Sequence, residues 1–592
     1  MVKLHSICGV SLLLFGAYSM ADVNYQMTIT QPEHHLSDIR VEFPATAQSF
    51  LDVKLPAWRT GRYEILDMAN GVRLFNANDK NGHSLKWEKI EKSTWRIHLD
   101  QPTEVSLNYQ VYANELGYRS RHIDDSHAFI DASGFFMYSE SFRQEPVTVN
   151  LSVPKKWRSV SGMNSGRSAH QFVAANYDVL VDSPIETGIN QWHEFEVDGR
   201  QYELVIWGHG NYDVELMLSD LKKLVKTGTE IWHAYPYERY VFMVHATSGA
   251  RGATEHLNST IIQRHRESFE KRDDYLGFIS TAAHEFIHTW NVKAYRPAGM
   301  VPYDYINPNY TKLLWLAEGS TSYLEEHLLL RAEIMTQQEM FKQMSKSINR
   351  HLATPGRTIQ SAAETSFDKW INQGGDHGRN YSTNIYSEGA LVSFALDIDI
   401  LKRTNGKKSY RDVHQLLYKN FALPKGFTEH DVIDILNSLT GADYSTWWQA
   451  HITEPAQIDF DLLLNEIGLE LVYPKGHSMV ADPQMSFKSG SELSTLTAVQ
   501  RNGAAWQAGL TTDDMIVAIN GQKAPADLKG YFTQYQAGET VKVDFFRRDT
   551  LMSTTLTFAE KSDKDKVVQV VTDPTEQQKA LYKAWIGHSL IK

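Results

Sequence analysis

The chain has 592 residues, too many for a single hydrophobic core, so three or four domains are expected. Hydrophobic residues make up 42% and charged residues 22%, and no run of 18 or more apolar residues occurs, which argues against a membrane-spanning helix. The net charge of −12 argues against a nucleic-acid partner, which would favour a basic face.

The first 21 residues have the pattern of a secretory signal peptide. Lys3 precedes the apolar run "ICGVSLLLFGAY" (7–18), and "SMA" (19–21) ends it with small residues. A buried first strand or helix is the alternative. The only cysteine, Cys8, lies in this segment, so the mature chain would contain no disulfide. These features predict export to a bacterial periplasm or secretion from the cell.

Residues 22–196 are predicted to form an antiparallel β-sandwich. Segments such as "YQMTITQ", "IRVEFPA" and "EVSLNYQVYA" alternate apolar and polar residues between turn-forming residues. No amphipathic helical pattern interrupts them. The alternation is typical of strands with one face on a core.

Residues 197–455 are predicted to form a small mixed sheet followed by a helical lobe. "RQYELVIWG" and "ERYVFMVHA" have strand patterns, and apolar residues then recur at spacings of three and four. The predicted helices of the lobe are 275–295, 310–332, 336–352, 386–403, 409–420 and 428–440.

Residues 456–592 return to strand patterns. The segment 495–524, "TLTAVQRNGAAWQAGLTTDDMIVAINGQKA", predicts a strand, a glycine turn, a short helix and a second strand. A hairpin is expected over 539–559. An amphipathic helix over 574–586 is expected to pack against a domain.

The segment "HEFIH" (284–288) is a candidate zinc site. An α-helix brings residues i and i+4 onto one face, so His284 and His288 can bind one ion while Glu285 faces the attacking water. A buried helix that happens to contain two histidines is the alternative. A catalytic zinc needs a third protein ligand, and Glu318 in "LLWLAEGSTSYLEEHLLL" is the candidate, because a bare carboxylate in this apolar stretch would be costly.

Glutamates later in the same helix, Glu325 and Glu326, better fit a solvent-exposed position. Glu255 in "GATEH" follows a strand and could bind the α-amino group of a peptide, although an ordinary surface glutamate is the alternative. Tyr381 and Tyr386 in "YSTNIYSEG" could supply a hydrogen bond to an oxyanion, or could be packing residues. Chemistry alone leaves these assignments open.

Longer motifs resemble those of one family, the glycyl aminopeptidase-type gluzincin metallopeptidases with a C-terminal PDZ domain. The similar segments are "LPAWRTGRY" (55–63), "GATEH" (252–256), "HEFIHTWNVKAYRP" (284–297), "LAEGSTSYLEE" (316–326), "YSTNIYSEG" (381–389) and "NGAAWQAGL…DDMIVAINGQ". The resemblance covers nearly the whole mature chain.

The resemblance implies a multidomain α+β protein with a thermolysin-like peptidase domain and one Zn²⁺ per chain. It implies that His284, His288 and Glu318 bind the metal and that Glu285 is the catalytic base. It further implies that Glu255 anchors the substrate amine and that Tyr386 donates to the oxyanion, with Tyr381 supporting it. The chain departs from the family at Thr254, in a segment where relatives often carry an apolar residue, and at "DPQMSF" (482–487), which lacks the glycines of a PDZ carboxylate-binding loop.

The predicted function is therefore a zinc aminopeptidase that removes small N-terminal residues, Gly or Ala, from peptides. Two alternatives remain from the sequence. One is a zinc endopeptidase that holds substrates with its PDZ domain, and the other is a non-enzymatic binding protein of the cell envelope. The sequence does not predict the oligomeric state.

Overall fold

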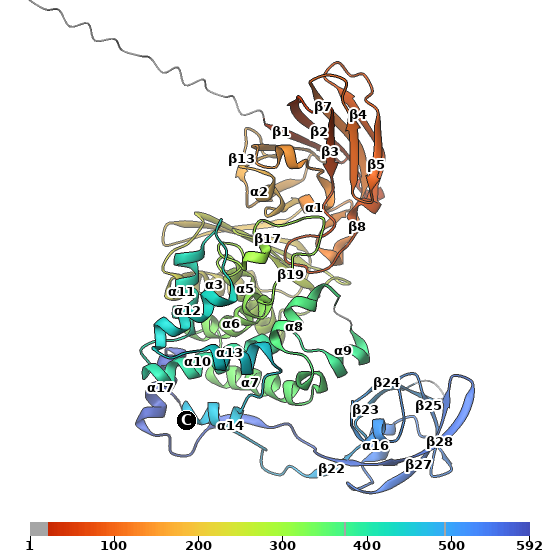
Figure 1. Cartoon of the computed structure of the whole chain (residues 1–592), viewed down its shortest axis with the longest axis vertical. Helices are drawn as coiled ribbons and strands as arrows, with labels where there is room; N and C mark the ends of the chain where they lie inside the picture. The colour runs from red at the N-terminus through yellow and green to blue at the C-terminus, as the bar shows by residue number, and fades with distance from the viewer. Residues whose placement is uncertain (1–21, 372–373, 490–492, 592) are drawn as a thin grey trace, which may run out of the picture. The chain divides into compact units, whose positions relative to one another are not determined.

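The computed structural model describes residues 22–371, 374–489 and 493–591 (Figure 1). The predicted signal peptide, residues 1–21, lies outside these ranges. Contacts divide the chain into two compact units: the first ends at Gly188, and the second begins at Ile189 but also includes Ala57–Leu66 and Glu115–Arg119. Within the described ranges, no helix is both long and apolar enough to cross a membrane.

The first unit consists mainly of strands whose alternate residues are buried. In β1 (Val23–Thr28), Val23, Tyr25 and Met27 are buried while the residues between them are not, as expected where one face of a sheet covers a core. A seven-stranded sheet has the order β13-β14-β11-β1-β2-β7-β4, a second sheet contains β12-β15-β10-β9, and β3-β6-β5 form a third. The β-rich N-terminal domain expected from the sequence is present.

One strand pair differs from the prediction of a purely antiparallel sandwich. β1 pairs in antiparallel fashion with β2 (Leu36–Thr46) but in parallel with β11 (Val147–Ser152). A parallel neighbour requires a long crossover, which the intervening chain provides. The remaining elements of the first unit are β3 (Phe50–Lys54), β4 (Val72–Asp79), β5 (Trp87–Glu91), β6 (Thr94–His98), β7 (Thr103–Tyr112), β9 (Arg121–Ile123), β10 (His127–Ile130), α1 (Ala132–Phe135), β12 (Arg158–Ser161), β13 (Asn164–Ser165), β14 (Gln171–Ala174), α2 (Tyr177–Val181) and β15 (Ile185–Gly188).

The second unit opens with the predicted mixed sheet, in the order β16-β17-β18-β20-β19. The three central strands are parallel, and both edge strands are antiparallel to their neighbours. The elements of this part are β16 (Gln191–Val197), β17 (Arg200–Gly208), α3 (Val214–Thr227), α4 (Thr229–Trp232), β18 (Arg239–Ala246), β19 (Gly252–Glu255) and β20 (Ser259–Arg264).

The six predicted helices of the lobe are all present, with shifted ends. The helix predicted from 310 begins ten residues later as α6 (Ser320–Arg331), after the π-helical turn Trp315–Gly319, and α5 (Arg272–His288) stops seven residues before the predicted end at 295. Val292 has a φ of 103°, which no α-helix tolerates, so the chain leaves the helical path there. The helices of the lobe are α5, α6, α7 (Gln337–Leu352), α8 (Ala362–Phe367), α9 (Gly375–Tyr381), α10 (Ser387–Thr404), α11 (Tyr410–Phe421), α12 (Glu429–Thr440) and α13 (Ser445–Trp448).

The C-terminal part of the chain contributes to two separate hydrophobic cores. One core joins the mixed sheet and the helical lobe to residues of α14, β21, β30 and α17, such as Leu464, Val568 and Trp585. The other is formed within 481–558 by a sheet of order β23-β24-β25-β27-β28 and two short helices. Residues 456–592 therefore include segments that complete the peptidase core.

The bounds of these C-terminal elements are α14 (Phe460–Glu466), β21 (Leu469–Val472), β22 (Met479–Asp482), β23 (Met485–Ser489), β24 (Ser494–Val499), α15 (Ala504–Gln507), β25 (Met515–Ile519), β26 (Gln522–Lys523), α16 (Leu528–Phe532), β27 (Thr540–Arg547), β28 (Thr550–Thr557), β29 (Ala559–Ser562), β30 (Val567–Val570) and α17 (Glu576–Ile586). The predicted C-terminal helix corresponds to α17, which packs on the peptidase core.

Candidate metal centre and substrate pocket

The last two turns of α5 carry the two candidate metal-binding histidines. His284 and His288 are one helical turn apart, and their ring centroids are 4.6 Å apart with the planes at 81°. Phe286 and Ile287 are fully buried in the core beside them. Packing of these apolar residues fixes the rotation of α5 and presents the two imidazoles on one face.

Glu318 completes a cluster of three donor atoms. It lies in a π-helical turn, Trp315–Gly319, that leads into α6, and it is only 2% exposed. Its Oε2 atom lies 3.6 Å from Nε2 of His284 and 3.3 Å from Nε2 of His288. Donors roughly 2.0–2.1 Å from a tetrahedral zinc are about 3.3–3.4 Å apart, so the three side chains have the spacing that such an ion requires.

Hydrogen bonds to the far side of each ligand fix its orientation. Nδ1 of His284 lies 2.7 Å from Oε2 of Glu325, and Nδ1 of His288 lies 2.8 Å from the carbonyl oxygen of Asn291. Since these oxygens only accept, each Nδ1 donates and each Nε2 faces Glu318. The hydroxyl of Tyr63 donates to the other Glu318 oxygen, Oε1, at 2.6 Å. Such outer contacts are typical of protein metal sites.

Backbone contacts explain how the π-helical turn is held against α5. The Asn291 amide donates to the carbonyl oxygens of Leu316 and Ala317, each at 3.0 Å. On its other side, a Cβ atom added to Gly319 would lie 2.3 Å from Cα of Gly389 in α10. Only glycine permits this approach, which brings the start of α10 to the metal cluster.

The buried charges of the cluster shift one another's pKa values. Burial lowers the pKa of His284, but hydrogen bonds to Glu318 and Glu325 outweigh it and leave the pKa raised. The pKa of Glu318 is well below its ordinary value, because the two imidazoles outweigh burial, which raises it. Burial raises the pKa of Glu285 to about 7, against the opposing effect of both histidines. A carboxyl group with a pKa near neutrality can accept and return a proton.

Glu255 lies at the end of β19, at the edge of the mixed sheet, and is 5% exposed. Carboxylate oxygens of Glu255 and Glu285 and a ring nitrogen of His288 all lie within 4.8 Å of one another. Gly61 has a φ of 79°, and a Cβ atom there would lie 2.5 Å from Oε2 of Glu255. The Glu255 carboxylate is therefore seated directly against the backbone of Gly61.

Of the two candidate tyrosines, only Tyr386 joins this group. Its ring centroid is 6.0 Å from that of His284, and burial together with the nearby carboxylates raises its pKa, so the phenol remains a donor. Tyr381, at the end of α9, is 37% exposed and stacks on His377. Tyr381 is not among the residues that line the pocket, so the expected support of Tyr386 by Tyr381 is not found there.

A cavity of about 390 Å³ is lined by acidic, aromatic and histidine side chains and also by three basic side chains. The first group comprises Glu255, His284, Glu285, His288, Glu318 and Tyr386. Arg62, Arg119 and Lys369 contribute the positive charges, and burial lowers the pKa of Lys369. Arg119 donates through Nε to the hydroxyl of Thr254 at 3.1 Å. The Thr254 hydroxyl thus orients a cavity arginine.

Several site residues were not identified from the sequence. The expectation that Glu325 and Glu326 are surface residues is wrong, since both are partly buried and Glu325 binds His284. Glu325 lies seven residues, about two helical turns, after Glu318, so helical periodicity could have placed it on the same face. Tyr63 occurs in a motif that the sequence singles out, whereas nothing local marks Lys369.

Comparisons with known proteins agree with this geometry. Residues 24–189 match the Peptidase M61 N-terminal domain, and residues 277–392 match M61 glycyl aminopeptidase. The structure is similar to the crystal structure of an aminopeptidase N family protein from Idiomarina loihiensis, with a TM-score of 0.87 and 27% identity over 94% of this chain and 100% of that chain. A comparison with curated proteins gives no match.

More distant structural similarity extends to other peptidases. An M1 zinc metallopeptidase from Deinococcus radiodurans has a TM-score of 0.48 and 14% identity, covering 74% of this chain and 95% of that chain. Yeast LTA4 hydrolase in complex with bestatin has a TM-score of 0.49 and 14% identity, covering 74% and 68% of the two chains. These values are too low to add to the site assignment.

The two domain matches and the buried His-His-Glu cluster define the chain as a metallopeptidase. Its residues 24–189 and 277–392 are similar to the N-terminal domain and the glycyl aminopeptidase domain of the M61 family.

Proposed function

We propose that the chain is a zinc-dependent aminopeptidase that removes small N-terminal residues, Gly or Ala, from peptides. The position of Glu255 carries this proposal, because its buried carboxylate lines the same cavity as the three candidate metal ligands. The Nζ atom of Lys293 lies 4.0 Å from Oε1 of Glu255, at the outer limit of an ion pair. A buried carboxylate is stabilised by a closely paired cation, and the α-ammonium group of a peptide bound in the cavity is such a cation.

The spacing of Glu255 from the metal cluster fits the length of one residue. The backbone nitrogen and carbonyl carbon of a residue are about 2.5 Å apart. Glu255 has an oxygen within 4.8 Å of donor atoms of Glu285 and His288. An α-ammonium group paired with Glu255 therefore leaves the first carbonyl group beside the metal ligands, as removal of a single residue requires.

His284, His288 and Glu318 would hold the zinc ion, which fits their donor types and spacing. A zinc ion bound there supplies Lewis-acid polarisation of a water molecule and of the scissile carbonyl. Tyr63, Glu325 and Asn291 maintain the orientation of the three ligands.

The chain's own groups perform the proton transfers and stabilise charge. Glu285 takes a proton from the attacking water and passes it to the leaving amine. The Tyr386 hydroxyl donates a hydrogen bond to the oxyanion that develops on the scissile carbonyl. Glu255 holds the substrate amine while this occurs. The description of the matched glycyl aminopeptidase domain supports the proposed preference for Gly.

Two further parts of the proposal concern other regions. Residues 479–562 form a PDZ domain, a proposal supported by the strand–helix–strand arrangement of β24, α15 and β25 and by the separate core of this region.

The chain is exported to the periplasm or secreted, a proposal supported by the signal-peptide pattern of residues 1–21. N-terminal sequencing of protein purified from the envelope fraction would find Asp22 first if this is correct.

A metal-exchange assay with aminoacyl 4-nitroanilides tests the main proposal. Removal of metal with a chelator should abolish hydrolysis, and one equivalent of Zn²⁺ at the catalytic site should restore it, with Gly and Ala derivatives cleaved faster than Leu and Phe derivatives. A protein that binds zinc but cleaves none of these compounds, nor any free peptide, would instead be the non-enzymatic binding protein.

A further inference from the structure

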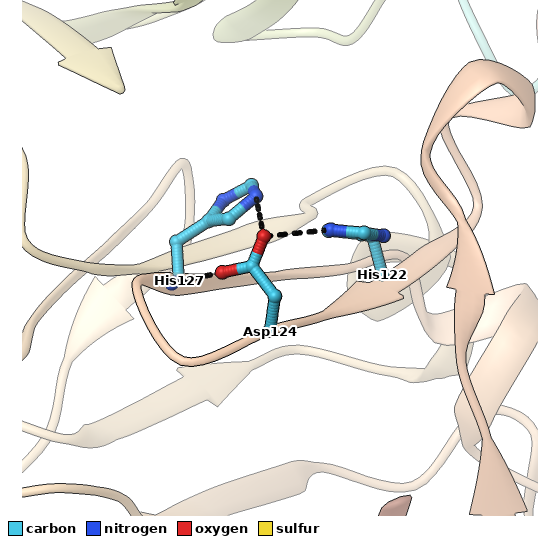
Figure 2. A group of neighbouring side chains, drawn as sticks. All are labelled: His122, Asp124 and His127. Carbon is cyan, nitrogen blue, oxygen red and sulfur yellow. Dashed lines mark hydrogen bonds and ion pairs between the residues drawn. The ribbon is translucent and has the colours of Figure 1, made fainter. Parts of the chain in front are cut away.

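A second cluster of histidine and carboxylate side chains lies in the first unit, in a part of the chain that no proposed catalytic step uses. His122 is in β9, Asp124 is in the turn that follows it, and His127 begins β10. Figure 2 shows both imidazole rings facing the Asp124 carboxylate between them. His127 is fully buried and His122 is 7% exposed, so the cluster is not a chance meeting of mobile surface groups.

The three donor atoms have nearly the spacing seen in the catalytic cluster. Oδ2 of Asp124 lies 3.1 Å from Nε2 of His122 and 4.0 Å from Nε2 of His127 (Figure 2). The corresponding distances from Glu318 to His284 and His288 are 3.6 and 3.3 Å. Both sets lie around the separation of about 3.3–3.4 Å expected for ligands of a tetrahedral ion.

The turn fixes the Asp124 carboxylate as a ligand that offers a single oxygen. Its Oδ1 atom accepts hydrogen bonds from the backbone amides of Ser126 and His127, at 2.8 and 3.0 Å, and from the Ser126 hydroxyl at 2.7 Å. Oδ2 is then directed at the two rings. Burial raises the pKa of Asp124, but hydrogen bonds and the nearby histidines outweigh it and leave the pKa well below its ordinary value. The carboxylate is thus ionised and preorganised.

A buried glutamate orients His127 in the way Glu325 orients His284. Nδ1 of His127 lies 3.0 Å from Oε1 of Glu186 in β15, and both side chains are at most 1% exposed. Since a carboxylate accepts, this contact assigns the Nδ1 proton to His127 and directs Nε2 towards Asp124. A carboxylate–histidine pair behind a donor nitrogen is the arrangement found around metal-bound histidines.

We propose that His122, Asp124 and His127 form a second metal site, for a divalent transition metal ion of the Zn²⁺ type, with Glu186 as the positioning residue of His127. Two imidazole nitrogens and one carboxylate oxygen suit such borderline ions, whereas Ca²⁺ and Mg²⁺ favour sites built from oxygen ligands. An ion there would link β9 to the start of β10 and has no part in peptide hydrolysis.

Zinc stoichiometry of the full-length protein tests this site. After equilibration with buffered Zn²⁺ and gel filtration, mass spectrometry of the metal should give about two equivalents for the unmodified protein. His122→Ala should bind one equivalent and keep its peptidase activity, and His288→Ala should bind one equivalent and lose activity. His430→Ala, at a side chain that is 83% exposed, is the matched control and should still bind two.

Two further measurements decide the case if His122→Ala fails to fold. Glu186→Gln should keep two sites but weaken the one in the first unit 10- to 100-fold. His288→Ala loaded with Co²⁺ should show the visible absorption bands of a tetrahedral cobalt site. A single zinc equivalent in the unmodified protein, removed entirely by His288→Ala with no cobalt bands remaining, would overturn the proposal and identify a metal-free hydrogen-bonded network.

Discussion

Replacement of Glu325 tests how much the outer contacts of the candidate zinc site contribute to metal binding. The Glu325 carboxylate lies 2.7 Å from Nδ1 of His284 and is only 19% exposed, so solvent screens this charge-assisted hydrogen bond weakly. Glu325→Gln retains an acceptor and removes the negative charge. Changes of this kind weaken metal binding about 10- to 100-fold.

The corresponding loss of binding free energy is about 1.4–2.7 kcal/mol. Competition of the protein with a chromophoric chelator for Zn²⁺ at pH 7 would measure it directly. Glu326→Gln is the matched control, because burial raises the pKa of the neighbouring Glu326 to about 8. That carboxyl is mostly protonated at pH 7, and an amide imitates it closely. Equal zinc dissociation constants for the two variants would refute the role assigned to Glu325.

Three more predictions concern the base, the amine anchor and the effect of pH. Glu285→Gln should lower kcat at least about 1,000-fold while zinc stoichiometry is unchanged; unaltered turnover would exclude Glu285 as the base. Gly61→Ala should lower kcat/KM for free peptides about tenfold or more, because the new Cβ would lie 2.5 Å from Oε2 of Glu255 and the φ of 79° disfavours alanine. A normal rate would show that Glu255 does not act from this position. With Zn²⁺ held in excess, kcat/KM should fall as the pH drops below about 7. Glu285, with a pKa of about 7, becomes protonated in this range, and protons also compete with zinc for His284 and His288, whose pKa values are raised. A flat profile down to pH 5 would contradict this expectation.

Local sequence patterns were sufficient to predict most secondary structure. Helical periodicity placed six of the helices of the lobe but missed the short helices α8, α9 and α13, and alternation identified the strands of the first unit. The parallel pairing of β1 with β11 was not predictable in this way, because alternation reports which face of a strand is buried and not which strand lies beside it. The packing of α17 on the peptidase core is equally a long-range property.

The candidate site was predictable where its residues share one helix or follow an apolar segment. His284, Glu285 and His288 share the last turns of α5, and Glu318 was conspicuous as a carboxylate among apolar residues. Tyr63 lies in a motif that the sequence singled out, but its contact with Glu318, 255 positions later in the chain, is a long-range property that no local pattern indicates. Tyr381 was selected by its spacing from Tyr386, but the end of α9 leaves it largely outside the pocket.

Cleavage of paired free and N-acetylated peptides tests the central claim most directly. Acetylation removes the positive charge that Glu255 is proposed to bind and leaves the peptide otherwise unchanged. The unmodified enzyme should release Gly or Ala from the free peptide and leave the acetylated one intact, and Glu255→Gln should lower kcat/KM for the free peptide at least about tenfold. Equal cleavage of both peptides, with no effect of Glu255→Gln, would contradict the aminopeptidase account and favour an endopeptidase.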